Sequence, residues 1–326
     1  MTQGTLVSSS TQEVVAELLG RRAFVMVSHV KPDGDTLGAG LALGIALKRL
    51  GKRVHYFQQD PVPRNLRFLP DTEFVSRDIP SDLPPDTLYV FCDMSDFSRA
   101  GEFLPQLDRA NMLDIDHHLG NSHFGKFNYV LDSECSTGTV VMHLFRELNV
   151  EIDRDLATCI LTTIMTDTGG FMHSNTTPAV LELSAELMRI GADKEQITEE
   201  IFANRRIAAT RLLGRVIDAM RFAHEGRYCY SYVDDPMLAQ TGADGEDTED
   251  VVNTLRAQEG VEVAALFKAY EGEIRVSLRS NGRVNVQAAA ATLGGGGHFR
   301  ASGLTYRGSL QDAFGAVDTA LVAQGL

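Results

Sequence analysis

Short apolar runs alternate with helical stretches through residues 11–190 of this 326-residue chain. Four runs have the length and composition of buried strands: 23–27, 53–57, 87–92 and 111–115. Three stretches between or after them have the composition and spacing of helices: 36–50, 136–148 and 154–165. Strands that alternate with helices predict a mostly parallel sheet with helices on both faces. The chain is therefore expected to belong to the α/β class.

The remainder of the chain predicts a second, smaller domain. Helical periodicity dominates from about 178 to 222, and four further strands are expected at 228–233, 261–267, 274–279 and 284–286. Helical runs fill the gaps between these strands, so this part is also expected to be mixed α/β. We expect a domain at 1–190, a helical connector at 191–222 and a smaller domain at 223–326, with the active site in the cleft between the domains.

Composition and charge exclude several classes of protein. Hydrophobic residues make up 44% and charged residues 23% of the chain, as in globular proteins. No apolar stretch approaches the roughly 18–20 residues that a membrane span needs. The four cysteines are scattered, without a CxxC pair, and no targeting segment is recognisable, which favours a reducing, cytoplasmic location. A net charge of −14 argues against a broad surface for long nucleic acids but permits a small phosphorylated substrate.

Carboxylates and imidazoles follow three of the predicted strands, and one more carboxylate follows a predicted helix. They are His29, Asp33 and Asp35 after the first strand, Asp93 after the third, Asp116, His117 and His118 at the fourth, and Asp167 after the helix. Ligands of parallel sheets bind beyond the carboxyl ends of the strands, so we expect these clusters to converge. Uncompensated charge at a buried strand end is costly, which implies a cation. Oxygen ligands mixed with imidazole favour Mn²⁺ or Mg²⁺ over a thiolate zinc site.

Each cluster has an ordinary explanation when it is taken alone. Asp93 could cap a helix or a turn, and His117 and His118 could form a polar turn. All the clusters together, each after an apolar segment, favour a two-metal site in which one carboxylate bridges cations roughly 3.5–4 Å apart. Such a pair lowers the pKa of a bridging water and stabilises the charge that develops on an attacked phosphoryl group.

A glycine-rich segment in the second predicted domain is the other indication of function. Gly294 to Gly297 are consecutive glycines whose backbone N–H groups could approach an anion closely, and a helix beginning after them would strengthen the effect. The alternative is a flexible linker. Because His298, Arg300 and Ser302 follow at once, the segment is interpreted as a phosphate-binding loop. Arg279 ends a predicted strand and carries a guanidinium suited to phosphate, although alone it would be an ordinary edge-strand arginine.

In combination these motifs resemble the DHH phosphoesterase superfamily, and most of all its two-domain NrnA-type group of oligoribonuclease/pAp phosphatases. The pattern His29-x-x-x-Asp33-x-Asp35 is similar to the first family motif and Asp93 to the second. The name-giving third motif matches 116–118, and Asp167 matches the fourth. The segment 279–303 resembles the DHH-associated C-terminal domain. The resemblance covers nearly the whole chain, and no ligand position is missing.

The resemblance implies a role for each of these residues. The cations would be two Mn²⁺, with Mg²⁺ or Co²⁺ as alternatives. One would be held by His29, Asp33, Asp93 and Asp167, and the other by Asp35, Asp93, His117 and Asp167. The catalytic residues would be His118, which faces the phosphate or the leaving oxygen, Asp93 as the bridge, and Asp116, which orients an imidazole. The nucleotide would be bound by Arg279, Gly295, Gly296, Gly297, His298 and Ser302.

The resemblance also implies an activity and leaves alternatives open. The protein would hydrolyse short RNA oligonucleotides, pApA or pAp by attack of metal-activated hydroxide on phosphorus. We expect these nucleotides as its partners, no association with a membrane, and a homodimer. An inorganic pyrophosphatase of the same superfamily should carry a lysine- and arginine-rich second domain, and a RecJ-like exonuclease should carry a further nucleotide-binding domain. A non-catalytic nucleotide sensor should have lost some of the metal-binding residues. The preferred substrate, the polarity on oligomers and the native metal stay open.

Overall fold

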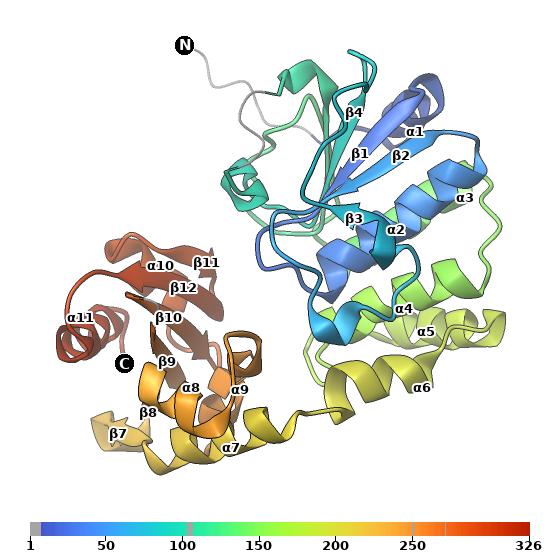
Figure 1. Cartoon of the computed structure of the whole chain (residues 1–326). Coiled ribbons are helices and arrows are strands. Elements are labelled where there is room, and N and C mark those ends of the chain that lie inside the picture. Colours follow the sequence, from blue (N-terminus) through green and yellow to red (C-terminus); the bar gives the residue numbers. More distant parts are fainter. Residues whose placement is uncertain (1–7, 103–106, 250, 271) are drawn as a thin grey trace. The chain divides into compact units, whose positions relative to one another are not determined.

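The computed structural model describes residues 8–102, 107–249, 251–270 and 272–326. It divides into two compact units, an N-terminal unit (Met1–Asn204) and a C-terminal unit (Arg205–Leu326), and most of their helices and strands are labelled in Figure 1. In the described part of the chain, no helix combines the length and the apolar character that a membrane crossing requires.

The N-terminal unit is built on a six-stranded sheet with the order β3-β2-β1-β4-β5-β6. All neighbouring strands pair in parallel, which confirms the predicted mostly parallel α/β sheet. The strands are β1 (Ala23–Val27), β2 (Arg53–Phe57), β3 (Val75–Ser76), β4 (Leu88–Cys92), β5 (Met112–Asp116) and β6 (Phe127–Val130). The edge strands β3 and β6 were not predicted.

Among the described residues, the α-helices that accompany this sheet are α1 (Thr11–Gly20), α2 (Gly34–Arg49), α3 (Thr137–Glu147), α4 (Arg154–Asp167), α5 (Pro178–Ile190) and α6 (Lys194–Ile197). Single turns complete the unit: η1 (Arg64–Leu66), η2 (Thr72–Phe74), η3 (Phe97–Ala100), η4 (Arg109–Asn111) and the π-helical turn η5 (Thr198–Ala203). The larger core joins Phe24 and Met26 of β1 to residues of these helices. Val25 and Val27 belong instead to a smaller apolar cluster. Every residue of β1 is therefore buried, which explains its unbroken apolar run.

The strand order brings the ends of β1 and β4 together at the centre of the sheet. From β1 the sheet grows through β2 and β3, and from β4 it grows the other way through β5 and β6. Such a switch point leaves a crevice at the carboxyl ends of the strands. Thr36 ties the two ends together, because its Oγ1 donates to the carbonyl oxygen of Cys92 at 2.7 Å and accepts from the backbone N–H of His29 at 3.3 Å. The residues that follow β1 and β4 are thereby held side by side.

The C-terminal unit has a mixed six-stranded sheet with the order β11-β12-β10-β9-β8-β7. Its pairs are antiparallel except for the parallel pair β8–β9, which confirms the mixed α/β prediction. The strands are β7 (Arg221–Ala223), β8 (Tyr228–Asp234), β9 (Val263–Tyr270), β10 (Glu273–Ser280), β11 (Gly296–His298) and β12 (Ala301–Tyr306). The helices are α7 (Ile207–Asp218), α8 (Asp235–Thr241), α9 (Val251–Arg256), α10 (Val286–Thr292) and α11 (Leu310–Val322), with short turns η6 (His224–Gly226) and η7 (Glu246–Thr248).

One expectation for this unit is wrong. The segment 284–286 is not a strand, because the Asn285 side chain accepts from the backbone N–H of Ala288 at 3.1 Å and caps α10, which begins at Val286. No helix begins directly after the consecutive glycines. Gly296 and Gly297 instead lie in β11, which forms a hairpin with β12.

Candidate metal centre

His29 follows β1 with its ring buried and its Nε2 directed at two carboxylates. The ring Nδ1 lies 2.9 Å from the carbonyl oxygen of Val30, which favours the tautomer with the proton on Nδ1 and a lone pair on Nε2. That Nε2 lies 3.7 Å from Asp33 Oδ2 and 3.5 Å from Asp93 Oδ2. Among the described residues it has no hydrogen-bond partner. A buried nitrogen that faces two carboxylate oxygens just beyond hydrogen-bond distance suits ligands arranged around a cation.

Two carboxylates at the beginning of α2, those of Asp33 and Asp35, accept hydrogen bonds from different helices. Asp33 caps the helix, since its Oδ1 accepts from the backbone N–H groups of Asp35 and Thr36 at 3.1 Å each. Its Oδ2 is the oxygen that faces His29. Asp35 is buried, and its carboxylate accepts from the N–H groups of Thr137 at 2.7 Å and Gly138 at 3.1 Å, at the beginning of α3. The positive end of α3 therefore stabilises the charge on Asp35.

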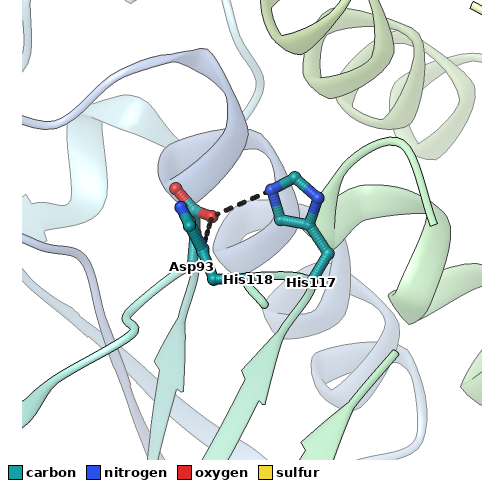
Figure 2. Close-up of side chains that lie close together, drawn as sticks. All are labelled: Asp93, His117 and His118. Atoms are coloured by element: carbon teal, nitrogen blue, oxygen red, sulfur yellow. Dashed lines mark ion pairs between the residues drawn. The ribbon is translucent and has the colours of Figure 1, made fainter. Parts of the chain in front are cut away.

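Asp93 follows β4 in the left-handed backbone conformation (φ 63°), and its two carboxylate oxygens face different partners. Oδ2 is the oxygen directed at His29, at 3.5 Å. Oδ1 lies 3.6 Å from Nε2 of His117 and 3.3 Å from Nδ1 of His118, as Figure 2 shows. The same Oδ1 accepts from the hydroxyl of Thr137 at 3.1 Å. One carboxylate thus has an oxygen toward each of two groups of side chains, the arrangement expected of a bridge between two cations.

His117 brings together the second group of ligand atoms. Its Nδ1 lies 3.2 Å from the carbonyl oxygen of Glu134, so its Nε2 is the atom directed into the site. That Nε2 lies 3.0 Å from Asp167 Oδ2 and 3.7 Å from Asp35 Oδ2. Ligand atoms of these three residues lie within 4.8 Å of one another, as do those of His29, Asp33 and Asp93. Within the described ranges Asp167 falls in the His117 group alone, whereas the family resemblance assigned it to both cations.

His118 is oriented by a buried carboxylate. Its Nδ1 lies 2.6 Å from Asp116 Oδ1. The other oxygen of Asp116 accepts from the Asn121 amide at 2.6 Å, and the same amide donates to Asp114 Oδ2 at 2.8 Å. Asp114 and Asp116 are both fully buried. This network fixes the His118 ring through Nδ1, the nitrogen that also lies 3.3 Å from Asp93 Oδ1.

Electrostatics show that the cluster carries more negative charge than its surroundings compensate. Burial, reinforced by repulsion from Asp167 and Asp93, raises the pKa of Asp35 well above its usual value. Burial also raises the pKa of Asp167 to about 6, although its pairing with His117 opposes the rise. Burial lowers the pKa of His117, but Asp167 and Asp35 outweigh it and bring the pKa to about 11. Protons therefore compensate part of this charge, and divalent cations would take their place.

The donor set fits hard divalent cations. Both ligand groups consist of carboxylate oxygens and imidazole nitrogens, and no cysteine belongs to them in the described part of the chain. All four cysteines are buried and free. Burial raises the pKa of the Cys92 thiol well above its ordinary value, and Cys92 belongs to neither ligand group. The residues present could therefore hold Mn²⁺ or Mg²⁺ rather than a thiolate-bound zinc ion.

The predicted nucleotide-binding residues lie together in the C-terminal unit, on three adjacent strands and, for Gly295, directly before β11. Arg279 in β10 is paired with Ala301 in β12, and Gly297 in β11 is paired with Ser302 in β12. A Cβ atom at Gly295 would collide with the backbone of Gly303, so this position requires glycine for packing alone. The backbone of His298 lies in β11, but its side chain lies outside the described residues.

Thr137 is a site residue that the sequence analysis did not identify. It holds two predicted ligands at once, through its N–H to Asp35 and its hydroxyl to Asp93. Ser136 and Thr139 form a capping box at the start of α3. That pattern is recognisable in the sequence as a helix N-terminus, which is a place where carboxylates are stabilised.

Comparisons with known proteins identify the family of the chain. Residues 23–164 match the DHH family, N-terminal domain, and residues 225–323 match the DHHA1 domain. The chain therefore belongs to the DHH family of phosphoesterases, as its motifs predicted. It is similar to the bifunctional oligoribonuclease and PAP phosphatase NrnA of Thermus thermophilus. The identity is 38% over 283 residues, which cover 87% of this chain and 84% of that protein.

Solved structures share the fold. An exopolyphosphatase-related protein from Bacteroides fragilis superposes with a TM-score of 0.87 at 24% identity, and the match covers 96% of this chain and 95% of that one. RecJ from Thermus thermophilus, solved in complex with Mn²⁺, superposes with a TM-score of 0.55 at 14% identity. That match covers 96% of this chain and 53% of RecJ.

Proposed function

We propose that the protein is a two-metal phosphoesterase that hydrolyses short phosphorylated nucleotides. The observation that carries the proposal is the position of Asp93. Its Oδ2 faces His29 at 3.5 Å, and its Oδ1 faces His117 at 3.6 Å. Membership of the DHH family and the similarity to NrnA support the same chemistry.

Two cations would occupy the two ligand groups, with Asp93 between them. The remaining ligands would be His29 and Asp33 on one side and Asp35, His117 and Asp167 on the other. When bound, such a pair supplies a water of lowered pKa and neutralises negative charge on the attacked phosphorus. Mn²⁺ is the proposed native ion, because the donors are carboxylate and imidazole. RecJ, which has the same fold, has been solved both with Mn²⁺ and with Mg²⁺. Mg²⁺ and Co²⁺ are the alternatives to test beside it.

His118 is proposed to act on the substrate through Nε2. Its Nδ1 is held by Asp116 Oδ1 at 2.6 Å, so the ring orientation is set before the substrate arrives. A histidine fixed in this way can donate a hydrogen bond or a proton to the oxygen that leaves phosphorus. Asp116 then acts as a positioning residue, since it touches the imidazole and not the reacting atoms.

The C-terminal unit is proposed to select the nucleotide. Arg279 supplies a guanidinium on β10, and β11 supplies backbone N–H groups of glycines that lack side chains to obstruct an anion. The remaining candidates are Gly295, Gly296, Gly297, His298 and Ser302. The name of the Thermus relative covers both oligoribonucleotides and PAP, so short RNA, pApA and pAp are the proposed substrates. A cytoplasmic location and a homodimer are part of the same proposal.

A product time course tests this function. Purified protein with Mn²⁺ is incubated with pAp, pApA, a five-residue RNA and pyrophosphate, with Asp93→Asn as the inactive control. We expect mononucleotides, and inorganic phosphate from pAp, to accumulate while pyrophosphate persists. Loss of pyrophosphate while all three nucleotides persist would favour the pyrophosphatase alternative. No turnover of any substrate in the presence of Mn²⁺ would favour a nucleotide sensor.

A further inference from the structure

A buried amide contacts the carboxylate that holds His118. Asn121 lies in the loop after β5 with 7% of its surface exposed, and three acceptors surround its Nδ2. They are Asp116 Oδ2 at 2.6 Å, Asp114 Oδ2 at 2.8 Å and the carbonyl oxygen of Met94 at 3.1 Å. Because an amide nitrogen carries two hydrogens, neither is left without an acceptor. One of these acceptors belongs to the carboxylate that also faces the ring of His118.

The other end of the amide determines which way it points. Its Oδ1 accepts from the backbone N–H of His123 at 2.6 Å. The backbone of the same loop is held as well, because the N–H of Asn121 donates to the carbonyl oxygen of His118 at 3.3 Å. The N–H of Ser122 donates to the carbonyl oxygen of Ser95 at 2.8 Å. A flipped amide would set Oδ1 against two carboxylates, so the side chain of Asn121 has a single suitable orientation.

Asp116 uses both of its carboxylate oxygens, and Asn121 holds one of them. Oδ1 accepts from the backbone N–H of His117 at 2.8 Å and lies 2.6 Å from His118 Nδ1. Oδ2 accepts from Asn121. Without the amide, Oδ2 of this buried carboxylate would lose a donor, and the carboxylate could rotate about its Cβ–Cγ bond toward another one. Such a rotation moves Oδ1 away from the imidazole, so the orientation of His118 depends on Asn121.

We propose that Asn121 is a positioning residue for hydrolysis, which keeps Asp116 and through it His118 in the orientation that meets the substrate phosphate. This role rests on the proposed function and adds a residue to it. In the described part of the chain, the side chain of Asn121 forms no hydrogen bond with either ligand group of the metal centre. A displaced general acid slows the chemical step, because reactivity depends steeply on the alignment of the reacting atoms. The loss should therefore appear in kcat, with KM and metal binding preserved.

Kinetics and a proton resonance of His118 separate this role from a purely structural one. With Mn²⁺ and whichever of pAp, pApA or short RNA is hydrolysed fastest, Asn121→Ala should lower kcat about tenfold to a hundredfold. Its KM, and its Mn²⁺ affinity by calorimetry, should stay within about twofold of wild type. In the Mg²⁺-loaded protein, the proton on His118 Nδ1 should give a far-downfield NMR signal that His118→Asn lacks. Asn121→Ala should broaden this signal or move it upfield, because the contact with Asp116 at 2.6 Å is no longer held.

Asn128→Ala is the matched control. Asn128 in β6 is also a buried amide, but its side chain pairs with the backbone N–H and carbonyl of Gly125, at 2.9 and 3.0 Å. A kcat of Asn121→Ala within about twofold of this control would overturn the inference. A raised KM at unchanged kcat, an equal loss of Mn²⁺ affinity, or an unchanged His118 signal would also overturn it.

A second variant covers the case in which Asn121→Ala does not fold. Asn121→Ser keeps one donor, and it must still show a lower kcat than wild type and a changed His118 signal. The NMR signal needs no turnover, so it also distinguishes this inference from the proposed function. If wild type hydrolyses no nucleotide, the proposed function fails, and the signal in Asn121→Ala still decides whether Asn121 orients the His118 ring.

Discussion

Replacement of Asp93 by Asn removes the charge between the two ligand groups with little other change. Asn has nearly the same shape and tolerates the left-handed backbone that Asp93 adopts at φ 63°. Its amide oxygen can still accept the hydrogen bond that the Thr137 hydroxyl now donates at 3.1 Å. We therefore expect the free energy of unfolding of the metal-free variant to stay within about 1 kcal/mol of wild type.

The effect on metal binding should be far larger. One unit charge at about 4 Å from another, in an effective dielectric of about 20, contributes about 4 kcal/mol, and a divalent cation doubles this. If solvent and relaxation remove half, about 4 kcal/mol remains for each cation, or roughly a thousandfold in affinity. For wild type, metal at a hundred times its Kd stabilises the fold by about 2.7 kcal/mol per site. That corresponds to roughly 5–10 °C in the Tm of a unit of this size.

Thermal unfolding across a Mn²⁺ titration, followed by turnover of pAp, measures both effects. The Asn variant should lose the metal-dependent rise in Tm and nearly all turnover. For Asp93→Ala without metal, the free energy of unfolding should fall by about 2 kcal/mol. This variant loses the hydrogen bond from Thr137, and alanine is strained in the left-handed backbone conformation. If Mn²⁺ raised the Tm of Asp93→Asn as much as it raises that of wild type, Asp93 would not be a metal ligand. Turnover by this variant above about a tenth of the wild-type rate would lead to the same conclusion.

Four substitutions and one change of pH test other parts of the site. His118→Asn should lower kcat about 10²- to 10³-fold and keep the metal-dependent rise in Tm, and loss of that rise would contradict its role. Gly295→Ala should destabilise the C-terminal unit by about 1–3 kcal/mol in thermal unfolding, whereas Gly296→Ala meets open space and should unfold like wild type with weaker nucleotide binding. Arg279→Ala should mainly raise KM, and an equal loss of kcat at unchanged KM would argue against substrate binding. Because the pKa of Asp167 is raised to about 6, protons compete with the cation below that pH, so calorimetry should find weaker Mn²⁺ binding at pH 5.5 than at pH 7.5.

The central strands could be predicted because burial leaves a simple mark on their sequence. All five residues of β1 are buried, so its run is apolar throughout. The edge strands gave no such signal. The strand β3 has two residues, and β6 has four, two of them only partly buried. Short edge strands are defined by their neighbours in the sheet more than by their own composition.

The convergence of these carboxylates and imidazoles could be predicted, but the contacts of each oxygen and nitrogen atom could not. Side-chain chemistry and strand ends were enough to bring His29, Asp93 and His117 to one edge of the sheet. The assignment of each Asp93 oxygen to a different group depends on its left-handed backbone and on the hydroxyl of Thr137. Neither a single left-handed residue nor a single hydroxyl contact produces a recognisable pattern in the sequence. The roles of these residues in metal binding and catalysis stay predictions.

The glycine-rich segment shows how one composition can serve two purposes. Its glycines suggested an anion-binding loop, and the structure places Gly296 and Gly297 in the hairpin of β11 and β12. Gly297 has a φ of 134°, and Gly295 packs against the backbone of Gly303. Part of the glycine content is therefore required by the hairpin itself. Phosphate binding by the exposed N–H groups would be an additional use of the same segment.

An anomalous difference map from crystals grown with Mn²⁺ would locate the cations themselves. We expect two peaks per chain, one beside His29 and Asp33 and one beside Asp35, His117 and Asp167, with the Asp93 carboxylate between them. A single peak, or two peaks that leave Asp93 out of the coordination, would contradict a two-metal centre bridged by this residue.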